Sequence, residues 1–191
     1  MRKCGLAFLA FFYHDFREDQ KRDLRGLLSS VLFQFCDQSD PYCDILSKFY
    51  STHRYGAQSP SDDALVHCLE DILKVPGQAP VFLIVDALDE CSNTSLMPSH
   101  REKALALLEK LISLQLPNLR ICVTSRPEVD IKAILVPLTF RSISLQDERG
   151  QMEDIENYIK SVIEKDPRNR RWTAQDKQMV IDILTRNADG M

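Results

Sequence analysis

The sequence lacks any hydrophobic run long enough to cross a membrane, and it lacks a large excess of charge of one sign. Its longest apolar runs, Leu6–Tyr13 and Val81–Val85, are far shorter than the ~18–20 residues of a membrane-spanning helix. The 24 basic and 28 acidic residues leave a formal net charge of −4. Without a net positive field, neither nucleic acid nor an anionic membrane is the expected partner.

The sequence also lacks a complete secretion signal. Arg2 and Lys3 precede an apolar stretch, as in a signal peptide, but no small-x-small cleavage site follows it. We therefore expect a cytoplasmic protein. Its composition, with 44% hydrophobic and 27% charged residues, is that of a folded globular chain, and 191 residues are enough for a sizeable core.

Cysteine and histidine are too few and too scattered for a disulfide scaffold or a zinc site. The chain has six cysteines, whereas disulfide-stabilised folds are usually small and rich in cysteine. No Cys-x-x-Cys pair occurs, and the four histidines lack the i, i+4 spacing of zinc ligands. We expect reduced thiols. Cys122, inside an apolar run, is interpreted as a small core residue, and Cys91, which follows a group of acids, could be exposed.

Apolar runs of strand length alternate with amphipathic stretches along the chain. Four runs have the length and composition of strands: residues 6–13, 81–85, 119–123 and 139–145. Three stretches show helical periodicity: residues 24–35, 151–164 and 173–187. Three further helix starts are marked by capping residues: Asp40-Pro41, Ser59-Pro60 and the capping box Ser99-His-Arg-Glu102. This alternation predicts an α/β fold with a mostly parallel sheet covered by helices on both faces, followed by C-terminal helices.

Acidic residues follow the second predicted strand. Asp86 comes directly after the apolar run 81–85, and Asp89 and Glu90 lie within the next turn. Ligands of parallel sheets bind at the carboxyl ends of the strands, and Mg²⁺ prefers carboxylate oxygens and water. One carboxylate can hold a hydrated ion while another orients the water that attacks a phosphate. Alternatively, acids at a strand end simply cap the turn that follows.

A polar and basic group follows the next predicted strand. Thr124, Ser125 and Arg126 come directly after residues 119–123, so they are expected at the same edge of the sheet as the acids. A guanidinium group there can form paired hydrogen bonds with phosphate oxygens. Alternatively, Arg126 forms a salt bridge with Asp86 or Asp89.

Together these motifs resemble the NACHT-type branch of the STAND P-loop NTPases, in particular the nephrocystin-like modules of fungal ankyrin-repeat proteins. Residues 82–90 are similar to the Walker B segment of that family, and residues 123–127 are similar to its sensor motif. The resemblance implies that Asp86 binds Mg²⁺, that Asp89 or Glu90 positions the attacking water, and that Ser125 and Arg126 contact phosphate.

The resemblance extends over about residues 5–191 and implies a domain organisation. A three-layer P-loop NTPase-like core would occupy residues 1–146, and a helical region would begin in residues 147–191. The P-loop itself, Gly-x-x-x-x-Gly-Lys-[Ser/Thr], wraps phosphates with its backbone and its lysine, but no Gly-Lys pair occurs in this chain. The family places that motif on a strand between the predicted third and fourth strands. We therefore expect a sheet without its P-loop strand and impaired nucleotide binding.

Two functions are compatible with these features. The first is a partial NACHT domain of a nucleotide-dependent signalling or self-recognition switch. The complete module would bind Mg²⁺ with ATP or ADP, hydrolyse ATP and assemble with protein partners, whereas this chain alone would be inactive. The second is a non-catalytic protein-interaction scaffold with a degenerate NTPase fold.

Overall fold

The computed structural model describes residues 6–93, 98–144 and 149–188, with the backbone alone at residues 149–152. The chain divides into two compact units, residues 1–139 and residues 140–191. The boundary expected between residues 146 and 147 lies outside the described residues. None of the helices in the described ranges is long and apolar enough to cross a membrane.

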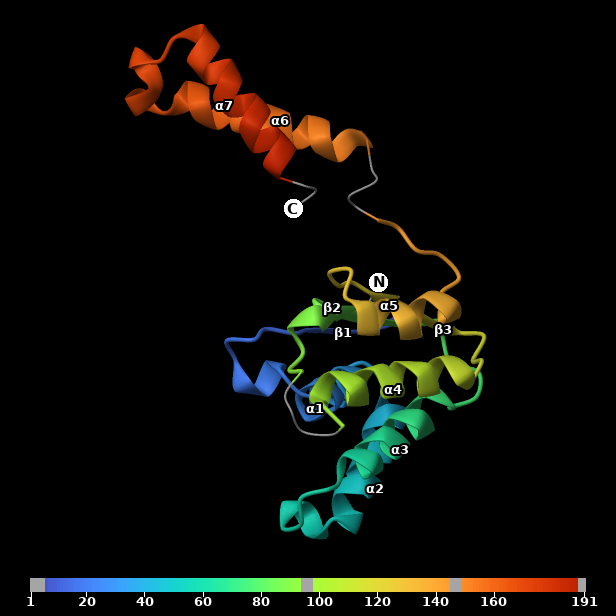
Figure 1. Cartoon of the computed structure of the whole chain (residues 1–191). Helices are drawn as coiled ribbons and strands as arrows, with labels where there is room; N and C mark the ends of the chain where they lie inside the picture. The colour runs from blue at the N-terminus through green and yellow to red at the C-terminus, as the bar shows by residue number, and fades with distance from the viewer. Residues whose placement is uncertain (1–5, 94–97, 145–148, 189–191) are drawn as a thin grey trace. The chain divides into compact units, whose positions relative to one another are not determined.

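The first unit is built on a parallel sheet of three strands (Figure 1). The strands lie in chain order: β1 (Phe8–Tyr13), β2 (Val81–Asp86) and β3 (Leu119–Val123). In the register, Ile84 of β2 is opposite Phe11 of β1 and Cys122 of β3. The α/β class, the parallel sheet and the first three predicted strands are confirmed.

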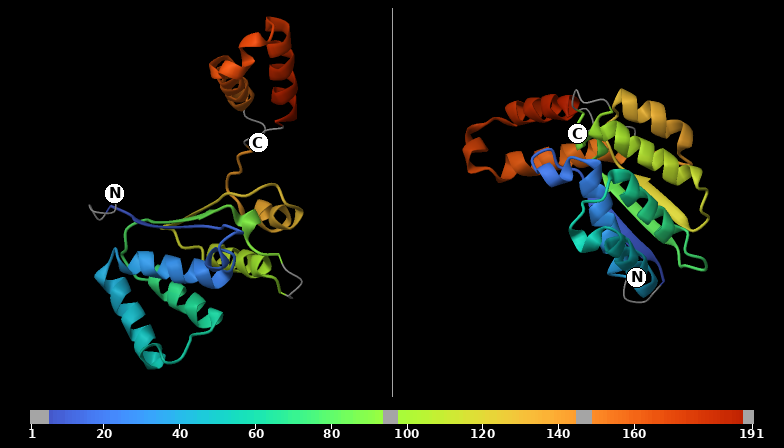
Figure 2. Two further views of the ribbon diagram at one scale, coloured as in Figure 1. Left: turned by 90° about the vertical axis from the view of Figure 1, so that its left-hand side faces the viewer. Right: turned by 90° about the horizontal axis from the view of Figure 1, so that it is seen from below.

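Helices cover one face of this sheet. They are α1 (Leu24–Cys36), α2 (Asp40–Thr52), α3 (Asp62–Leu73), α4 (His100–Ser113) and α5 (Val129–Leu135), with short 3-10 turns η2 (Asp19–Lys21), η3 (Arg54–Gly56), η4 (Leu88–Glu90) and η5 (Val136–Leu138). Leu28 of α1, Leu69 of α3 and Leu105 of α4 are fully buried in one core with Leu83 and Val85 of β2. In the left view of Figure 2, α1, α2 and α3 lie below the strands.

Capping side chains explain where α3 and α4 begin, and the sequence also predicted the start of α2. The predicted capping box of α4 is present: Ser99 Oγ accepts from the Glu102 amide at 3.1 Å, and Glu102 Oε2 accepts from the Ser99 amide at 2.7 Å. The start predicted at Asp40-Pro41 is confirmed for α2. The start predicted at Ser59-Pro60 is two residues early, because Ser61 accepts from the Ala64 amide at 3.2 Å and caps α3.

The second face of the sheet carries exposed side chains. Along β1 and β2, exposed Phe11, Tyr13 and Phe82 alternate with buried residues that face the helices. Cys122 of β3 is also exposed, so its interpretation as a core residue is wrong. The helices expected on this face are not found among the described residues of the unit. The strands β1, β2 and β3 are added to the sheet in one direction. Because crossovers between parallel strands are right-handed, the helices that connect these strands all lie on the same face.

The predicted fourth strand is not formed. Residues 139–144 contain no strand, and Leu145 lies outside the described residues. The alternating pattern of this segment suits a strand, but a strand requires a neighbour for its backbone hydrogen bonds. In the described part of the chain, no strand pairs with residues 139–144.

The second unit is a pair of helices, α6 (Arg149–Lys165) and α7 (Ala174–Asn187), joined by η7 (Pro167–Arg171). Both helices were predicted from the sequence, and they pack against each other. Thr173 begins α7 with a capping box: it accepts from the Asp176 amide at 3.1 Å, and Asp176 accepts from the Thr173 amide at 3.0 Å.

Because only one face of the sheet is covered, substitutions at the neighbouring residues Leu83 and Phe82 should differ in their effect on stability. Leu83→Ala removes a fully buried side chain and should lower the free energy of unfolding by about 2–5 kcal/mol. Phe82→Ala removes a larger side chain that is 41% exposed on the opposite face, and it should cost clearly less. Urea unfolding of both variants measures the difference. Equal losses would mean that both faces are covered in solution.

Candidate functional site

The carboxyl ends of β2 and β3 are tied together by Thr124. Its hydroxyl donates to Asp86 Oδ1 and accepts from the Ala87 amide at 3.0 Å. The Thr124 backbone continues the ladder, since its amide donates to the Val85 carbonyl and its carbonyl accepts from the Leu88 amide, both at 3.0 Å. Asp86 is thus held at the strand end, exposed, with its Oδ2 unpaired among the described residues.

A sharp turn carries the other two acids. Ala87 has a left-handed backbone (φ 53°, ψ 47°), which is an unfavourable conformation for a residue other than glycine. The turn buries Leu88 in the core and directs η4 back toward the strand ends. Strained positions of this kind persist where the surrounding structure holds them, and they cluster at functional sites.

Asp89 binds the residue that was predicted to sense phosphate. Asp89 Oδ1 accepts from the Arg126 amide at 3.0 Å, and Asp89 Oδ2 lies 3.5 Å from Arg126 Nε. The Asp89 side chain is 11% exposed, whereas the Arg126 side chain is 79% exposed. The alternative considered from sequence, a salt bridge between Arg126 and one of the acids, is therefore what the structure contains. Both predicted groups are at one edge of the sheet.

Glu90 and Ser125 lie at the same end of the sheet, and each forms a hydrogen bond with a backbone group. Glu90 Oε2 accepts from the Phe16 amide at 3.3 Å, which links the turn after β2 to the loop after β1. Ser125 is exposed, and its hydroxyl donates to the Arg126 carbonyl at 2.8 Å. Ser125 thus stabilises its own loop.

Arg101 of α4 is a residue that the sequence interpretation missed. Its side chain is 11% exposed and reaches the acidic turn: Nη2 donates to the Asp89 carbonyl at 2.5 Å, and Nε donates to the Cys91 carbonyl at 3.4 Å. Nη1 lies 3.3 Å from Asp130 Oδ2 in α5. One guanidinium therefore holds the turn that bears Asp89 and the helix that follows Arg126. No sequence pattern predicts this role, because Arg101 lies in the first turn of α4, twelve residues after Asp89, and contacts at that separation follow no regular spacing.

Cys91 is buried at the end of the same turn. Its thiol lies 3.3 Å from the Arg22 carbonyl, and burial raises its pKa to about 12. The expectation that Cys91 could be exposed is wrong. A protonated, buried thiol is not a nucleophile, so this residue has a packing role.

His14, which follows β1, is a second residue that the sequence interpretation missed. It is 2% exposed, and its Nδ1 lies 3.1 Å from the Lys21 carbonyl. Its Nε2 is buried without a hydrogen-bond partner among the described residues. Burial lowers the pKa of the imidazole, and the Lys21 carbonyl and the charges of Asp23, Asp89 and Glu90 oppose that shift. His14 is therefore a neutral imidazole beside an acidic group.

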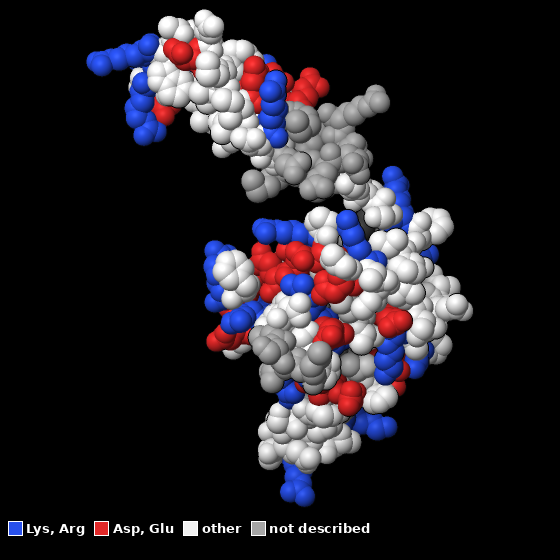
Figure 3. Space-filling model, viewed as in Figure 1, with Lys and Arg blue, Asp and Glu red and all other residues white. Residues whose placement is uncertain are grey.

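A hollow of about 480 Å³ lies beside these acids, between the turn after β2 and the loop after β3. Phe16, Arg22, Asp89, Glu90 and Arg126 contribute to its lining. Figure 3 shows acidic side chains gathered in this region with basic side chains beside them. In the described part of the chain, no three His, Cys, Asp or Glu side chains converge on a point that could hold a metal ion. A hydrated Mg²⁺ requires only one or two carboxylates, and Asp86 fits that need.

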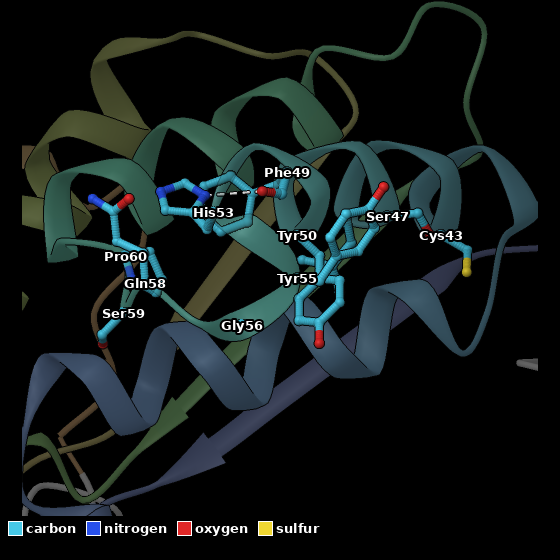
Figure 4. A pocket seen from close by; sticks show the side chains of 11 residues that line it. Cys43, Ser47, Phe49, Tyr50, His53, Tyr55, Gly56, Gln58, Ser59 and Pro60 are labelled. Carbon is cyan, nitrogen blue, oxygen red and sulfur yellow. Dashed lines mark hydrogen bonds between the residues drawn. The ribbon is translucent and has the colours of Figure 1, made fainter.

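A second hollow, of about 660 Å³, lies between α2 and the η3 turn (Figure 4). Its lining includes the rings of Phe49, Tyr50, His53 and Tyr55. None of the predicted site residues lines it. His53 Nδ1 is 2.9 Å from the Phe49 carbonyl, so that ring is held against its own helix.

The parallel sheet and the acids at its strand ends define an α/β protein with a candidate ligand site at the strand tips. The chain belongs to the nephrocystin 3 N-terminal family, since the model of that family matches residues 2–126, well over half of its length. This match confirms the predicted likeness to nephrocystin-like modules. Comparisons with curated proteins and with solved structures give no match.

Removal of the Arg101 side chain tests whether it holds the acidic turn. Arg101→Gln should leave buried carbonyls unpaired, with a loss of about 1–3 kcal/mol in the free energy of unfolding, and should speed the labelling of the Cys91 thiol. Labelling at each cysteine is followed by mass spectrometry of peptides. Arg120→Gln, an exposed change on β3, is the control. Unchanged Cys91 labelling in Arg101→Gln would show that the turn is held without Arg101.

The buried neutral His14 makes stability depend on pH. Its folded pKa lies below the unfolded value of about 6.5, so its protonation opposes the folded state. The contribution of His14 to the free energy of unfolding is constant above about pH 6.5. Below that pH it falls, until the pH has passed the folded pKa of His14. Urea unfolding at pH 7.5 and pH 5.5 should give a smaller acid-induced loss for His14→Asn than for the unchanged chain. Equal losses would assign the acid sensitivity to other groups.

Proposed function

We propose that this chain is the Walker B half of a NACHT-type nucleotide-dependent switch. One observation supports this most: Asp89 pairs with Arg126 beside a hollow at the carboxyl ends of two adjacent parallel strands, and Asp86 is the last residue of the first of these strands. Parallel sheets bind their ligands at this end, and the combination of acids with a guanidinium suits a magnesium nucleotide.

Each residue has a distinct role in this proposal. Asp86 holds hydrated Mg²⁺ through the carboxylate oxygen that Thr124 leaves unpaired. Asp89 or Glu90 positions the water that attacks the terminal phosphate, and Arg126, assisted by Ser125, contacts that phosphate. Bound Mg²⁺ would supply charge neutralisation for the phosphate oxygens. The 79% exposed Arg126 side chain can exchange Asp89 for phosphate with little loss of packing.

The proposed module is larger than its acidic half. Residues 1–146 would be the nucleotide-binding core without its P-loop, and residues 147–191 would begin a helical region, as in the nephrocystin-like modules of fungal ankyrin-repeat proteins. ATP or ADP with Mg²⁺ would bind the complete module, which would act in the cytoplasm and assemble with protein partners. A P-loop encoded upstream would supply the phosphate contacts that the acids cannot make.

A second candidate is a non-catalytic protein-interaction scaffold. It is favoured by a different observation: the acids are satisfied within the chain. Thr124 donates to Asp86, and Asp89 accepts from the Arg126 amide and forms an ion pair with the Arg126 side chain. These bonds stabilise the strand ends without any ligand, and the sequence has no Gly-Lys pair to hold phosphates.

Nucleotide binding separates the two candidates. Fluorescent ADP and ATP, each with Mg²⁺, are titrated into this chain and into a version extended upstream through a P-loop. We expect binding by the extended version only, and a Mg²⁺-dependent affinity at least about tenfold weaker in its Asp86→Asn variant. Asp71→Asn, an exposed acid on α3, is the matched control.

The other outcomes have defined meanings. Binding by neither version would favour the scaffold. Equal affinity in Asp86→Asn and the unchanged extended chain would remove Asp86 from the site. Binding by the 191-residue chain alone would contradict the need for a P-loop.

A further inference from the structure

A basic turn precedes the last helix of the second unit. η7 carries three exposed arginines, Arg168, Arg170 and Arg171. Thr173, which is also exposed, lies two residues after the last of them and is the N-cap of α7. The Arg168 guanidinium pairs with Asp166 at 2.7 Å, whereas Arg170 and Arg171 form no ion pair within the described residues. Two guanidinium groups next to an exposed hydroxyl are therefore available to a partner.

The spacing of these side chains distinguishes one hydroxyl from all others in the sequence. Arg170 and Arg171 lie three and two residues before Thr173. No other serine or threonine of the 191 residues has a basic residue at both of these positions. Ser144, which is exposed as well, has an arginine at the first of them only. Protein kinases select their substrates by such charge patterns, and a kinase with an acidic substrate groove binds arginines at a fixed distance from the acceptor hydroxyl.

We propose that Thr173 accepts a phosphoryl group from an arginine-directed protein kinase that recognises Arg170 and Arg171. In the transfer, Thr173 Oγ attacks the γ-phosphorus of the ATP that the kinase holds. The Oγ–P bond forms while the bond from that phosphorus to the β–γ bridging oxygen breaks, ADP leaves, and the hydroxyl proton passes to a base of the kinase. The inference uses residues of the second unit alone, so it does not depend on the nucleotide role of the first.

The backbone around the acceptor suits a kinase groove. Trp172 (φ −75°, ψ 139°) and Thr173 (φ −71°, ψ 162°) are both extended. None of the residues of η7 is buried. Segments with few buried contacts open locally at little cost in free energy, so the arginines of this turn can adapt to the groove while α6 and α7 stay folded.

Phosphorylation would change the first turn of α7. The Thr173 hydroxyl donates to Asp176 Oδ2 at 2.7 Å and accepts from the Asp176 amide at 3.1 Å. A phosphothreonine has no hydroxyl proton to donate, and its charge of about −1.5 to −2 repels the Asp176 carboxylate. The same charge attracts Arg170 and Arg171, which precede it in the chain. The modification would therefore replace part of the capping box with ion pairs to the basic turn and remove its excess positive charge.

A kinase assay on the full chain tests this proposal. The chain is incubated with Mg²⁺, ATP and the catalytic subunit of cyclic-AMP-dependent protein kinase, which is arginine-directed, and the modified peptides are identified by mass spectrometry. We expect phosphate at Thr173, at a rate at least about tenfold higher than at Ser144. An acid-directed casein kinase should leave Thr173 unmodified.

Substitutions separate the acceptor from the groups that the kinase recognises. Thr173→Asn retains an N-cap residue for α7 and should remove the phosphate. Arg170→Gln combined with Arg171→Gln should lower kcat/KM at least about tenfold. Arg168→Gln, at a side chain already paired with Asp166, is the matched control and should change kcat/KM less than about twofold. Circular dichroism checks that each variant folds.

Three results would overturn the proposal. The first is a full chain in which Thr173 stays unmodified, and phosphorylation of a free peptide of residues 166–178 would then show that the folded turn withholds the hydroxyl. The second is phosphate that appears mainly at Ser144 or at another residue. The third is an equal kcat/KM for the unchanged chain and the variant that lacks both Arg170 and Arg171.

Discussion

The backbone ladder between β2 and β3 is the interaction on which both the sheet and its candidate site depend. Thr124 continues that ladder past the last paired residues, and the same residue fixes the carboxylate of Asp86 and the amide of Ala87. The position of the acids is thus a direct consequence of strand pairing. The hydrogen bonds that form the sheet also orient the carboxylate at its end, so no further element is required to hold Asp86 in place.

Strand order explains the exposed surfaces of the first unit. The three strands are added in one direction, so right-handed crossovers put their helices on one face and leave Phe11 and Phe82 exposed on the other. The same order makes β1 and β3 the two edges. Gln34 and Gln38 protect the β1 edge with side-chain amides.

The parts of the structure that follow from local patterns could be predicted from the sequence, and the parts that depend on neighbours could not. Continuous apolar runs predicted β1, β2 and β3, and the capping box predicted the start of α4. Residues 139–144 have a strand-like pattern but no adjacent strand, and Cys122 lies in an apolar run whose outer face is uncovered. The periodicity of a sequence predicts which side chains share a face of a strand. It does not show whether another helix or strand covers that face.

The candidate site shows the same division. The sequence predicted that Asp86, Asp89 and Arg126 would meet at one edge, because strand ends in a parallel sheet lie together. It did not predict that Arg101 would bind the carbonyls of Asp89 and Cys91, since a contact between a helix start and a turn twelve residues away leaves no spacing rule to find.

Occupancy of the β3 edge and the state of the strand-end site are physically connected. Val123, which carries open backbone groups at that edge, immediately precedes Thr124, which holds Asp86. A strand that paired with Val123 would restrict the backbone from which Thr124, Ser125 and Arg126 project. Ordering of a segment on one side lowers the entropy lost when it binds on the other. Pairing at the β3 edge would therefore bear directly on the backbone that carries the candidate site residues.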